Sequence, residues 1–355
     1  MKLRLGRIFA LTCMLLLAAG LITVFVFSLQ VGTNATILAL LGMVLSFALA
    51  PILHEWGHIG FAELADMECV YAKFFCFKTY MKEGELQFGF ASPFAPDETQ
   101  VMPRSGGKMK ARVTLYALGG LILEGIFLAL VLTAWLLLRE KGEISYLFLG
   151  ALPYAGYLFL LNVVPAEYAG GKTDMQVCFG VWMGKDAEKV MLSAMEIQGL
   201  SYTGKSFAEI DEKLYFDVPQ LCEDEPLFAI MLDLRYRYYL DKNEVEKAAA
   251  QLNRLAQLQD YLPESVVEKI AAELVYMHAL RGDFESAEES GKLCKNFLQS
   301  KNCTAKRILL AYTKAFGKEE NLEPLWDQAD ELLQIERNHG IVKFEESLID
   351  RLFEE

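Results

Sequence analysis

Four long apolar stretches dominate the first half of the 355-residue chain. They run from Ile8 to Leu29, from about Ile37 to Phe61, from Val113 to Leu138 and from about Tyr146 to Pro165. About 20 apolar residues in a helix cross the roughly 30 Å hydrocarbon core of a bilayer. The pattern therefore predicts an all-α, polytopic membrane protein with about four transmembrane helices.

The first stretch has a second interpretation, a cleaved signal peptide, because Lys2, Arg4 and Arg7 stand before it. The apolar core of a signal peptide has about 7–15 residues and is followed by a cleavage site of small residues. The stretch from Ile8 to Leu29 is longer than that and has no convincing site of this kind. We therefore favour a helix that stays in the membrane.

The basic residues outside the stretches indicate their direction. The two short links on one side hold only Arg139 and Lys141. The N-terminus and the 66–112 loop on the other side hold Lys2, Arg4, Arg7, Lys73, Lys78, Lys82, Arg104, Lys108, Lys110 and Arg112. Basic residues concentrate in cytoplasmic loops. We therefore expect a multi-pass protein of the cell membrane with both termini in the cytoplasm.

The 66–112 loop contains residues that favour strands. Tyr71–Tyr80 and Glu85–Phe90 are rich in aromatic and β-favouring residues, and Lys82-Glu83-Gly84 between them is a plausible turn. The sequence predicts a β-hairpin there. The segment from Ser92 to Gly107, with three prolines and two adjacent glycines, is expected to be a loop.

The second half of the chain differs in charge. Residues 1–184 carry 13 basic and 13 acidic residues, whereas residues 185–355 carry 21 and 34 and so hold the whole net charge of −13. We predict a transmembrane domain over 1–184 and a cytoplasmic, acidic, α-helical domain over 185–355. An acidic domain repels phosphates, so we expect no nucleic-acid partner.

The acidic half contains an internal echo. Asn243-Glu-Val-Glu-Lys-Ala248 resembles Gly282-Asp-Phe-Glu-Ser-Ala287 at an offset of 39 residues, and Glu320–Leu325 is a weaker third copy. The turn is similar to that of tetratricopeptide repeats, whose usual period is about 34 residues. We favour a helical repeat array that binds a cytosolic protein partner. A plain helical bundle that only stabilises the protein is the alternative.

The second apolar stretch contains the motif that carries chemistry, His54-Glu55-Trp56-Gly57-His58. Residues four apart share a helix face, so two imidazoles of an H-E-x-x-H motif can bind one zinc ion. The glutamate beside them can take a proton from water at the metal. Ionisable groups in an apolar span are costly unless they have partners, which favours a metal site over incidental histidines.

The third ligand is expected just after the fourth stretch, because His278 and His339 lie in the acidic half. The candidates are Asp174 and Glu167, which follow Asn162 and Pro165. Taken alone, this segment is also compatible with an ordinary helix end and a solvated aspartate. The second and fourth stretches run in the same direction, which places Asp174 on the same side of the membrane as the histidines.

These two segments resemble the site-2-protease family of intramembrane zinc metalloproteases, over about residues 37–180. In that family an N-x-x-P segment, here Asn162 to Pro165, precedes an aspartate ligand, which corresponds to Asp174. The resemblance implies a Zn²⁺ ion on His54, His58 and Asp174, Glu55 as the base, and a role for Asn162 in holding the substrate backbone or oxyanion. It implies substrates that are membrane proteins or signal peptides, cut in or near a transmembrane segment.

The chain departs from the family pattern at two positions. Met175 stands where a glycine usually follows the aspartate, and Glu124 stands where an amide is usual in the intervening helix. Glu124 is interpreted either as a carboxyl that packs between helices or as a partner of a metal-bound histidine.

Two other classes of function compete with a protease. A membrane scaffold or adaptor would act through the acidic helical half and would have no need of Glu55. A divalent-metal transporter would need several carboxylates along the spans, and only Glu55, Glu124 and Glu63 are available.

Overall fold

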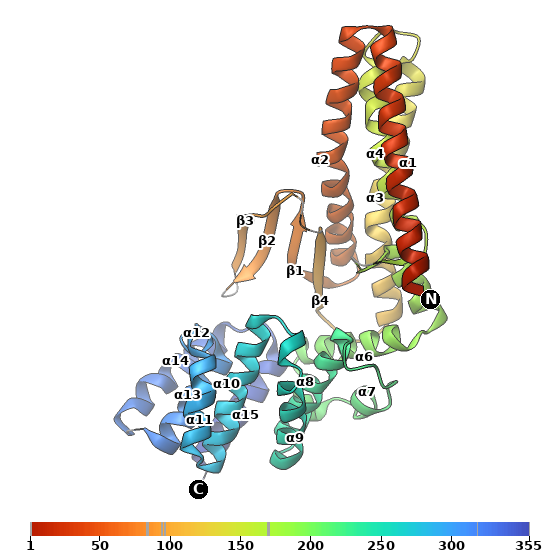
Figure 1. The fold of residues 1–355 in the computed structure, drawn as a ribbon. Helices are drawn as coiled ribbons and strands as arrows, with labels where there is room; N and C mark the ends of the chain where they lie inside the picture. The colour runs from red at the N-terminus through yellow and green to blue at the C-terminus, as the bar shows by residue number, and fades with distance from the viewer. Residues whose placement is uncertain are drawn as a thin grey trace. The chain divides into compact units, whose positions relative to one another are not determined.

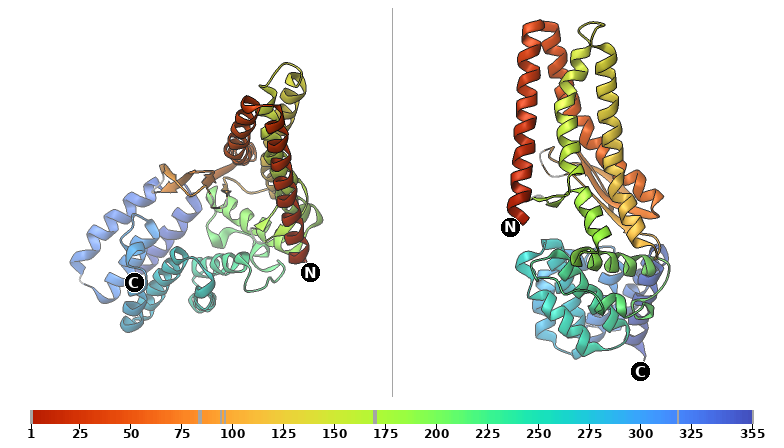
Figure 2. Two further views of the ribbon diagram at one scale, coloured as in Figure 1. Left: turned by 45° about the horizontal axis from the view of Figure 1, so that its top comes forward. Right: turned by 90° about the vertical axis from the view of Figure 1, so that its right-hand side faces the viewer.

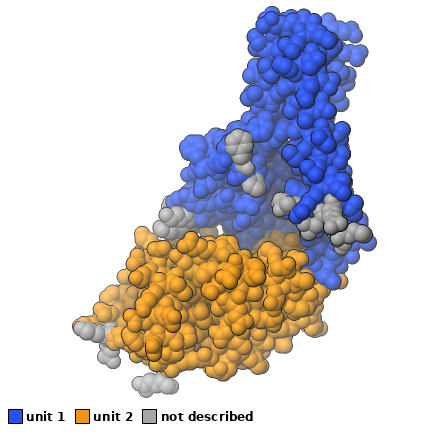
Figure 3. All heavy atoms as spheres, in the orientation of Figure 1, with its two compact units in different colours: residues 1–81, 86–102, 108–188 blue, residues 82–85, 103–107, 189–355 orange. Residues whose placement is uncertain are grey.

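The structure is a computed structural model that describes residues 2–82, 85–93, 95, 97–168, 171–317 and 319–354. The chain divides into two compact units (Figure 3). Unit 1 comprises residues 1–81, 86–102 and 108–188, and unit 2 comprises 82–85, 103–107 and 189–355. The main division lies four residues beyond the predicted boundary at 184, and two short pieces of the 66–112 loop group with unit 2.

Four long helices form the framework of unit 1 and run alternately up and down (Figures 1 and 2). They are α1 (Lys2–Val31), α2 (Thr33–Leu64), α3 (Met109–Leu138) and α4 (Ser145–Val163). Each is long and apolar enough to cross a membrane, as the sequence predicts. The fourth ends at Val163 instead of Pro165, because the residue before a proline disfavours helical geometry and Val164 is extended.

The chain is mostly helical, as the sequence predicts, and the 66–112 loop forms a four-stranded sheet that is larger than the predicted β-hairpin. The strands are β1 (Met67–Phe74), β2 (Phe77–Lys82), β3 (Glu85–Phe90) and β4 (Glu98–Pro103), in the order β3-β2-β1-β4. The expected single strand over Tyr71–Tyr80 is instead two antiparallel strands, which turn at Phe75 with a positive φ of 53°. Part of the turn predicted at Lys82-Glu83-Gly84 lies outside the described residues.

Strand β4 lies in the segment that the sequence predicts to be a loop. Exposure alternates along its first four residues, from Glu98 to Val101, as expected for a strand with two different faces. The prolines of this segment suggested a loop, but proline is tolerated at the end of an edge strand, and β4 ends at Pro103 on the edge of the sheet. Both edges, β3 and β4, lack a second neighbouring strand among the described residues.

A short reversal connects α4 to the last helix of the unit. Two-residue strands, β5 (Glu167–Tyr168) and β6 (Gly171–Lys172), pair with each other. Helix α5 (Asp174–Met183) follows directly and contacts α3. The reversal brings the residues after α4 back against the helices of unit 1.

Unit 2 is helical. Its helices are α6 (Asp186–Tyr202), α7 (Lys213–Phe216), α8 (Pro226–Asp241), α9 (Val245–Ala256), α10 (Glu264–Arg281), α11 (Phe284–Leu293), α12 (Lys295–Leu298), α13 (Cys303–Phe316), α14 (Leu322–Ile335) and α15 (His339–Phe353). Consecutive helices pack as α8 with α9, α10 with α11 and α13 with α14. Asn243 and Gly282, which the sequence echo aligns, both have positive φ, 60° and 70°, at the turns of the first two pairs.

A cluster of buried charges joins three helices of unit 2. Arg307 on α13 is fully buried and donates to Glu273 on α10 at 2.7 and 2.9 Å and to Glu345 on α15 at 2.6 Å. The Tyr236 hydroxyl donates to Glu273 at 2.8 Å, and the guanidinium lies 4.2 Å from the ring centroid of Tyr276. Both carboxylates pair with the buried cation, which would be very unfavourable in the interior without a partner.

Candidate metal centre

The motif residues lie on one face of α2, near its C-terminal end. His54, Glu55 and His58 are 8%, 5% and 5% exposed. The two imidazoles are one helical turn apart, and their Nε2 atoms approach to 3.1 Å. The four-residue spacing therefore brings both rings to a single point, as predicted from the sequence.

Asp174 occupies the first turn of α5, and Thr173 fixes its position as the N-cap. The Thr173 hydroxyl accepts hydrogen bonds from the backbone N–H of Gln176 at 3.2 Å and of Ala166 at 3.1 Å. It donates to the carbonyl of Val164 at 2.9 Å. One side chain thus holds both the start of the helix and the reversal before it, so the direction of the Asp174 carboxylate is well defined.

The Asp174 carboxylate meets both imidazoles. Oδ2 lies 3.2 Å from Nε2 of His54, and Oδ1 lies 3.4 Å from Nε2 of His58. One donor atom from each of the three residues lies within 4.8 Å of the other two. The group therefore combines two imidazole nitrogens with a carboxylate.

The other candidate ligands lie elsewhere. Glu167 is not in this group of the described residues, and β5 pairs it with Lys172 on β6. His278 and His339 belong to α10 and α15 of unit 2. Of the two carboxylates that the sequence offers after α4, only Asp174 joins the histidines.

The hydrogen bonds of the two Nδ1 atoms determine whether the Nε2 atoms of the same rings carry a proton or a lone pair. Nδ1 of His58 lies 3.0 Å from the Tyr116 carbonyl oxygen, which can only accept, so this nitrogen carries the proton. Nδ1 of His54 lies 3.0 Å from a carboxyl oxygen of Glu124, and an ionised Glu124 requires the same tautomer. In neutral rings both Nε2 lone pairs then face each other and the Asp174 carboxylate. Such donors repel one another unless a cation lies among them, so the set fits a divalent metal.

Glu124 makes the contact that the second of its two interpretations requires. Its side chain is fully buried on α3 and accepts from His54 at 3.0 Å. Asn162, at the end of α4 and 9% exposed, also lies beside the Glu124 carboxyl. A carboxylate behind a ligating imidazole fixes the orientation of the ring and makes its other nitrogen a better donor.

Met175, the other departure from the site-2-protease pattern, has little effect on the backbone. Met175 lies inside α5, where the chain is helical. Helical geometry does not need the positive φ that favours glycine, so this position does not require glycine.

Two residues without any recognisable sequence signal contact the motif. The Thr99 hydroxyl on β4 donates to Oε2 of Glu55 at 2.6 Å. The Tyr116 hydroxyl on α3 donates to the Thr99 carbonyl at 2.5 Å. No spacing rule connects a strand residue with a helix residue 44 positions earlier. The expectation of a loop around Thr99 also hid its position on a strand.

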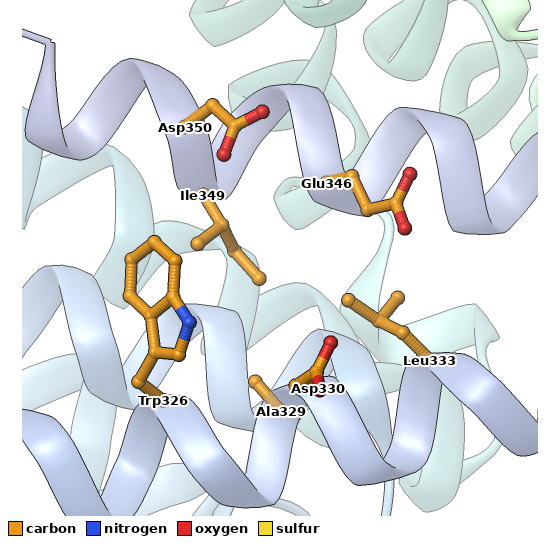
Figure 4. Close-up of a pocket in the computed structure, with 7 residues that line it drawn as sticks. All are labelled: Trp326, Ala329, Asp330, Leu333, Glu346, Ile349 and Asp350. Carbon is orange, nitrogen blue, oxygen red and sulfur yellow. The ribbon is translucent and has the colours of Figure 1, made fainter.

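A separate groove lies in unit 2, between α14 and α15 (Figure 4). Its volume is about 270 Å³. The apolar lining consists of Trp326, Ala329, Leu333 and Ile349. The remaining lining is acidic and consists of Asp330, Glu346 and Asp350. The groove offers apolar contacts and negative charge, with no imidazole among its lining residues.

Comparison with known proteins gives no relative: no family model, no curated protein and no solved structure matches the chain.

Proposed function

We propose that the chain is an intramembrane zinc metalloprotease that hydrolyses peptide bonds in or near the transmembrane segments of membrane proteins or signal peptides. The supporting observation is the convergence of two imidazoles and one carboxylate, with Glu55 beside them, among four apolar helices. The sequence resemblance to site-2 proteases points to the same residues.

The donor set fits the proposed ion. His54, His58 and Asp174 would hold it. Oδ2 of Asp174, which lies 3.2 Å from Nε2 of His54, is a buried oxygen that accepts no hydrogen bond from any described residue. Three protein ligands are the number that catalytic zinc sites use. When bound, Zn²⁺ activates water as a nucleophile and polarises the peptide carbonyl.

Glu55 supplies the proton transfer. Its carboxylate accepts the proton of the attacking water and returns it to the leaving amine. The Thr99 hydroxyl donates a hydrogen bond to Oε2 of Glu55, so we propose that the other carboxylate oxygen, Oε1, accepts the proton of the water. Asn162 lies beside Glu124, which contacts His54 of the motif. We propose that the Asn162 amide binds the substrate backbone or the oxyanion.

A substrate helix must unwind before its peptide bonds are accessible. The sheet of unit 1 has two edge strands, each with a single neighbouring strand among the described residues, which an extended segment can join. Of the two edge strands, β4 is the one that contacts the motif, through Thr99 and Glu55. We propose that the unwound segment pairs with β4 by strand addition.

The proposal is tested with purified full-length variants. Asp174→Ala should lose most of its zinc in elemental analysis, because two imidazoles alone bind the ion weakly. Glu55→Gln should keep one zinc per chain and lose cleavage. Unchanged zinc and activity in Asp174→Ala would exclude Asp174 as a ligand, and cleavage by Glu55→Gln would exclude Glu55 as the base.

The groove between α14 and α15 favours a second function, the binding of a cytosolic protein. Its apolar lining and three carboxylates are complementary to a segment with apolar and basic side chains. We propose that such a segment binds there, either in the service of the protease or in a scaffold that does not cleave.

A labelled helical peptide of leucine and lysine serves as the probe for the groove. Fluorescence anisotropy with the full-length chain should show binding that falls on replacement of Asp330, Glu346 and Asp350 by their amides. The matched control replaces Glu285, Glu288 and Glu289 on α11 by glutamine. Equal losses in both triple variants would show attraction by net charge alone and would contradict a site in the groove.

A further inference from the structure

Strand β4 contacts the motif through a closed circuit of hydrogen bonds. The Thr99 hydroxyl donates to Glu55 at 2.6 Å, and the Thr99 carbonyl accepts from the Tyr116 hydroxyl at 2.5 Å. The carbonyl of Tyr116 accepts from Nδ1 of His58 at 3.0 Å. Glu55 and His58 lie on the same helix, so the circuit closes through α2. It links the sheet, α3 and both functional groups of the motif.

The contact at Glu55 restricts the carboxylate. A glutamate side chain has three rotatable bonds and adopts one orientation only where its neighbours fix it. Thr99 is half-buried and Glu55 is 5% exposed, so little water competes for this hydrogen bond. Tyr116 in turn fixes the backbone that carries Thr99. The orientation of Glu55 therefore depends on the position of β4.

We propose that Thr99 is a positioning residue that holds the Glu55 carboxylate in its working orientation, with Tyr116 as the support of Thr99. This inference rests on the proposed function, in which Glu55 is the base. Since β4 is also an edge strand, a segment that pairs with β4 would change the orientation of the Glu55 carboxylate. A purely structural role would require only that the buried carboxylate has some hydrogen-bond donor.

The first test compares Thr99→Val with Thr99→Ser. Valine keeps the shape and removes the hydroxyl, whereas serine keeps the hydroxyl. The substrate is the membrane protein that accumulates when Glu55→Gln replaces the wild type. We expect kcat to fall about 10- to 100-fold in Thr99→Val, with KM and zinc content unchanged, and to recover in Thr99→Ser. Thr79→Val, a buried threonine on β2 of the same sheet, is the matched control and should cleave like the wild type.

Tyr116→Phe extends the test to the support. It should lower kcat in the same direction, and adding Thr99→Val should cause little further loss, because both variants break one circuit. Wild-type kcat in Thr99→Val, or fully additive losses in the double variant, would overturn the proposal.

A second readout needs no activity. Hydrogen exchange of β4 in the full-length chain should stay slow in Glu55→Gln, whose amide oxygen still accepts from Thr99, and become faster in Glu55→Leu. Equal exchange in both variants would contradict the contact itself. If no membrane protein accumulates with Glu55→Gln, the proposed protease function fails. The hydrogen-exchange comparison still tests whether Thr99 contacts Glu55, because it does not depend on cleavage.

Discussion

At the scale of single residues, a tight steric constraint on the candidate metal centre comes from a residue without a side chain. Gly120 on α3 faces the two imidazoles. A Cβ atom at this position would lie 2.5 Å from Nε2 of His58 and 2.8 Å from Cε1 of His54. Carbon atoms do not approach imidazoles so closely, so any larger residue must displace the rings.

Gly120→Ala is therefore expected to lower the zinc content of the purified chain by at least about 10-fold, since small shifts of the ligands weaken a metal site. Elemental analysis measures the effect. The matched control is Gly156→Ala on α4, where an added Cβ meets nothing within 4 Å. Full zinc content in Gly120→Ala, or an equal loss in Gly156→Ala, would contradict this reading of the site.

The same scale shows what the sequence can reveal about the site. The spacing of His54, Glu55 and His58 is a property of one helix, and the structure brings these residues together as predicted. Asp174 depended on a resemblance to a family motif and on helix direction, and the reversal at β5 and β6 brings it beside the two imidazoles. Thr99 was missed because its contact spans two elements, and such contacts follow from tertiary structure alone.

At the scale of elements, the length of the apolar stretches predicted the long helices well, whereas the prolines of the 66–112 loop wrongly indicated a loop where β4 lies. All four long helices of unit 1 follow from runs of apolar residues, whose length is decisive in a membrane. Strand β4 was missed because prolines on both sides are typical of loops, although exposure alternates from Glu98 to Val101 between them. The buried ion cluster of unit 2 was also hidden, because Glu273, Arg307 and Glu345 come from three separate helices.

Glu345→Gln tests that cluster. Arg307 would keep Glu273 and lose its second charged partner in a site with no exposure. Because Arg307 stays paired with Glu273, the variant loses one charged hydrogen bond and leaves no buried charge without a partner. The free energy of unfolding of unit 2 should therefore fall by about 1.5–3 kcal/mol. Urea titration of the full-length chain, followed by hydrogen exchange of α13, measures it.

The control is Glu209→Gln, which removes one partner of an ion pair with Lys343 that is about half exposed on both sides. Exposed pairs contribute little, so this variant should unfold like the wild type. If Glu345→Gln were equally harmless, the cluster would not stabilise the helices that it joins.

At the scale of the whole molecule, we predict that the first half of the sequence lies in a membrane and the second half in the cytoplasm. Residues 1–184 contain the apolar helices and balanced charge, whereas residues 185–355 hold the entire excess of acidic residues. This asymmetry is the basis of the predicted boundary at residue 184, and the last of the long apolar helices ends earlier, at Val163. The resemblance of the second half to helical repeats stays a prediction, supported by three helix pairs and by the left-handed residues Asn243 and Gly282.

The number of spans and the basic residues predict the topology. Reporter proteins fused at residue 1 and at residue 355 should both indicate the cytoplasm, because four spans return the chain to its starting side. A reporter inserted at Gly142, in the link between α3 and α4, should indicate the opposite side. Termini on opposite sides would contradict four spans, and with them the approach of Asp174 to the histidines within a membrane.

The most direct measurement is mass spectrometry of the membrane fraction from cells that produce either the wild-type chain or Glu55→Gln at equal levels. At least one membrane protein should accumulate intact with Glu55→Gln and be cut in or beside a transmembrane segment with the wild type. Thr79→Val should behave like the wild type. Identical membrane proteomes for the wild type and Glu55→Gln would contradict the proposal that this zinc site hydrolyses peptide bonds.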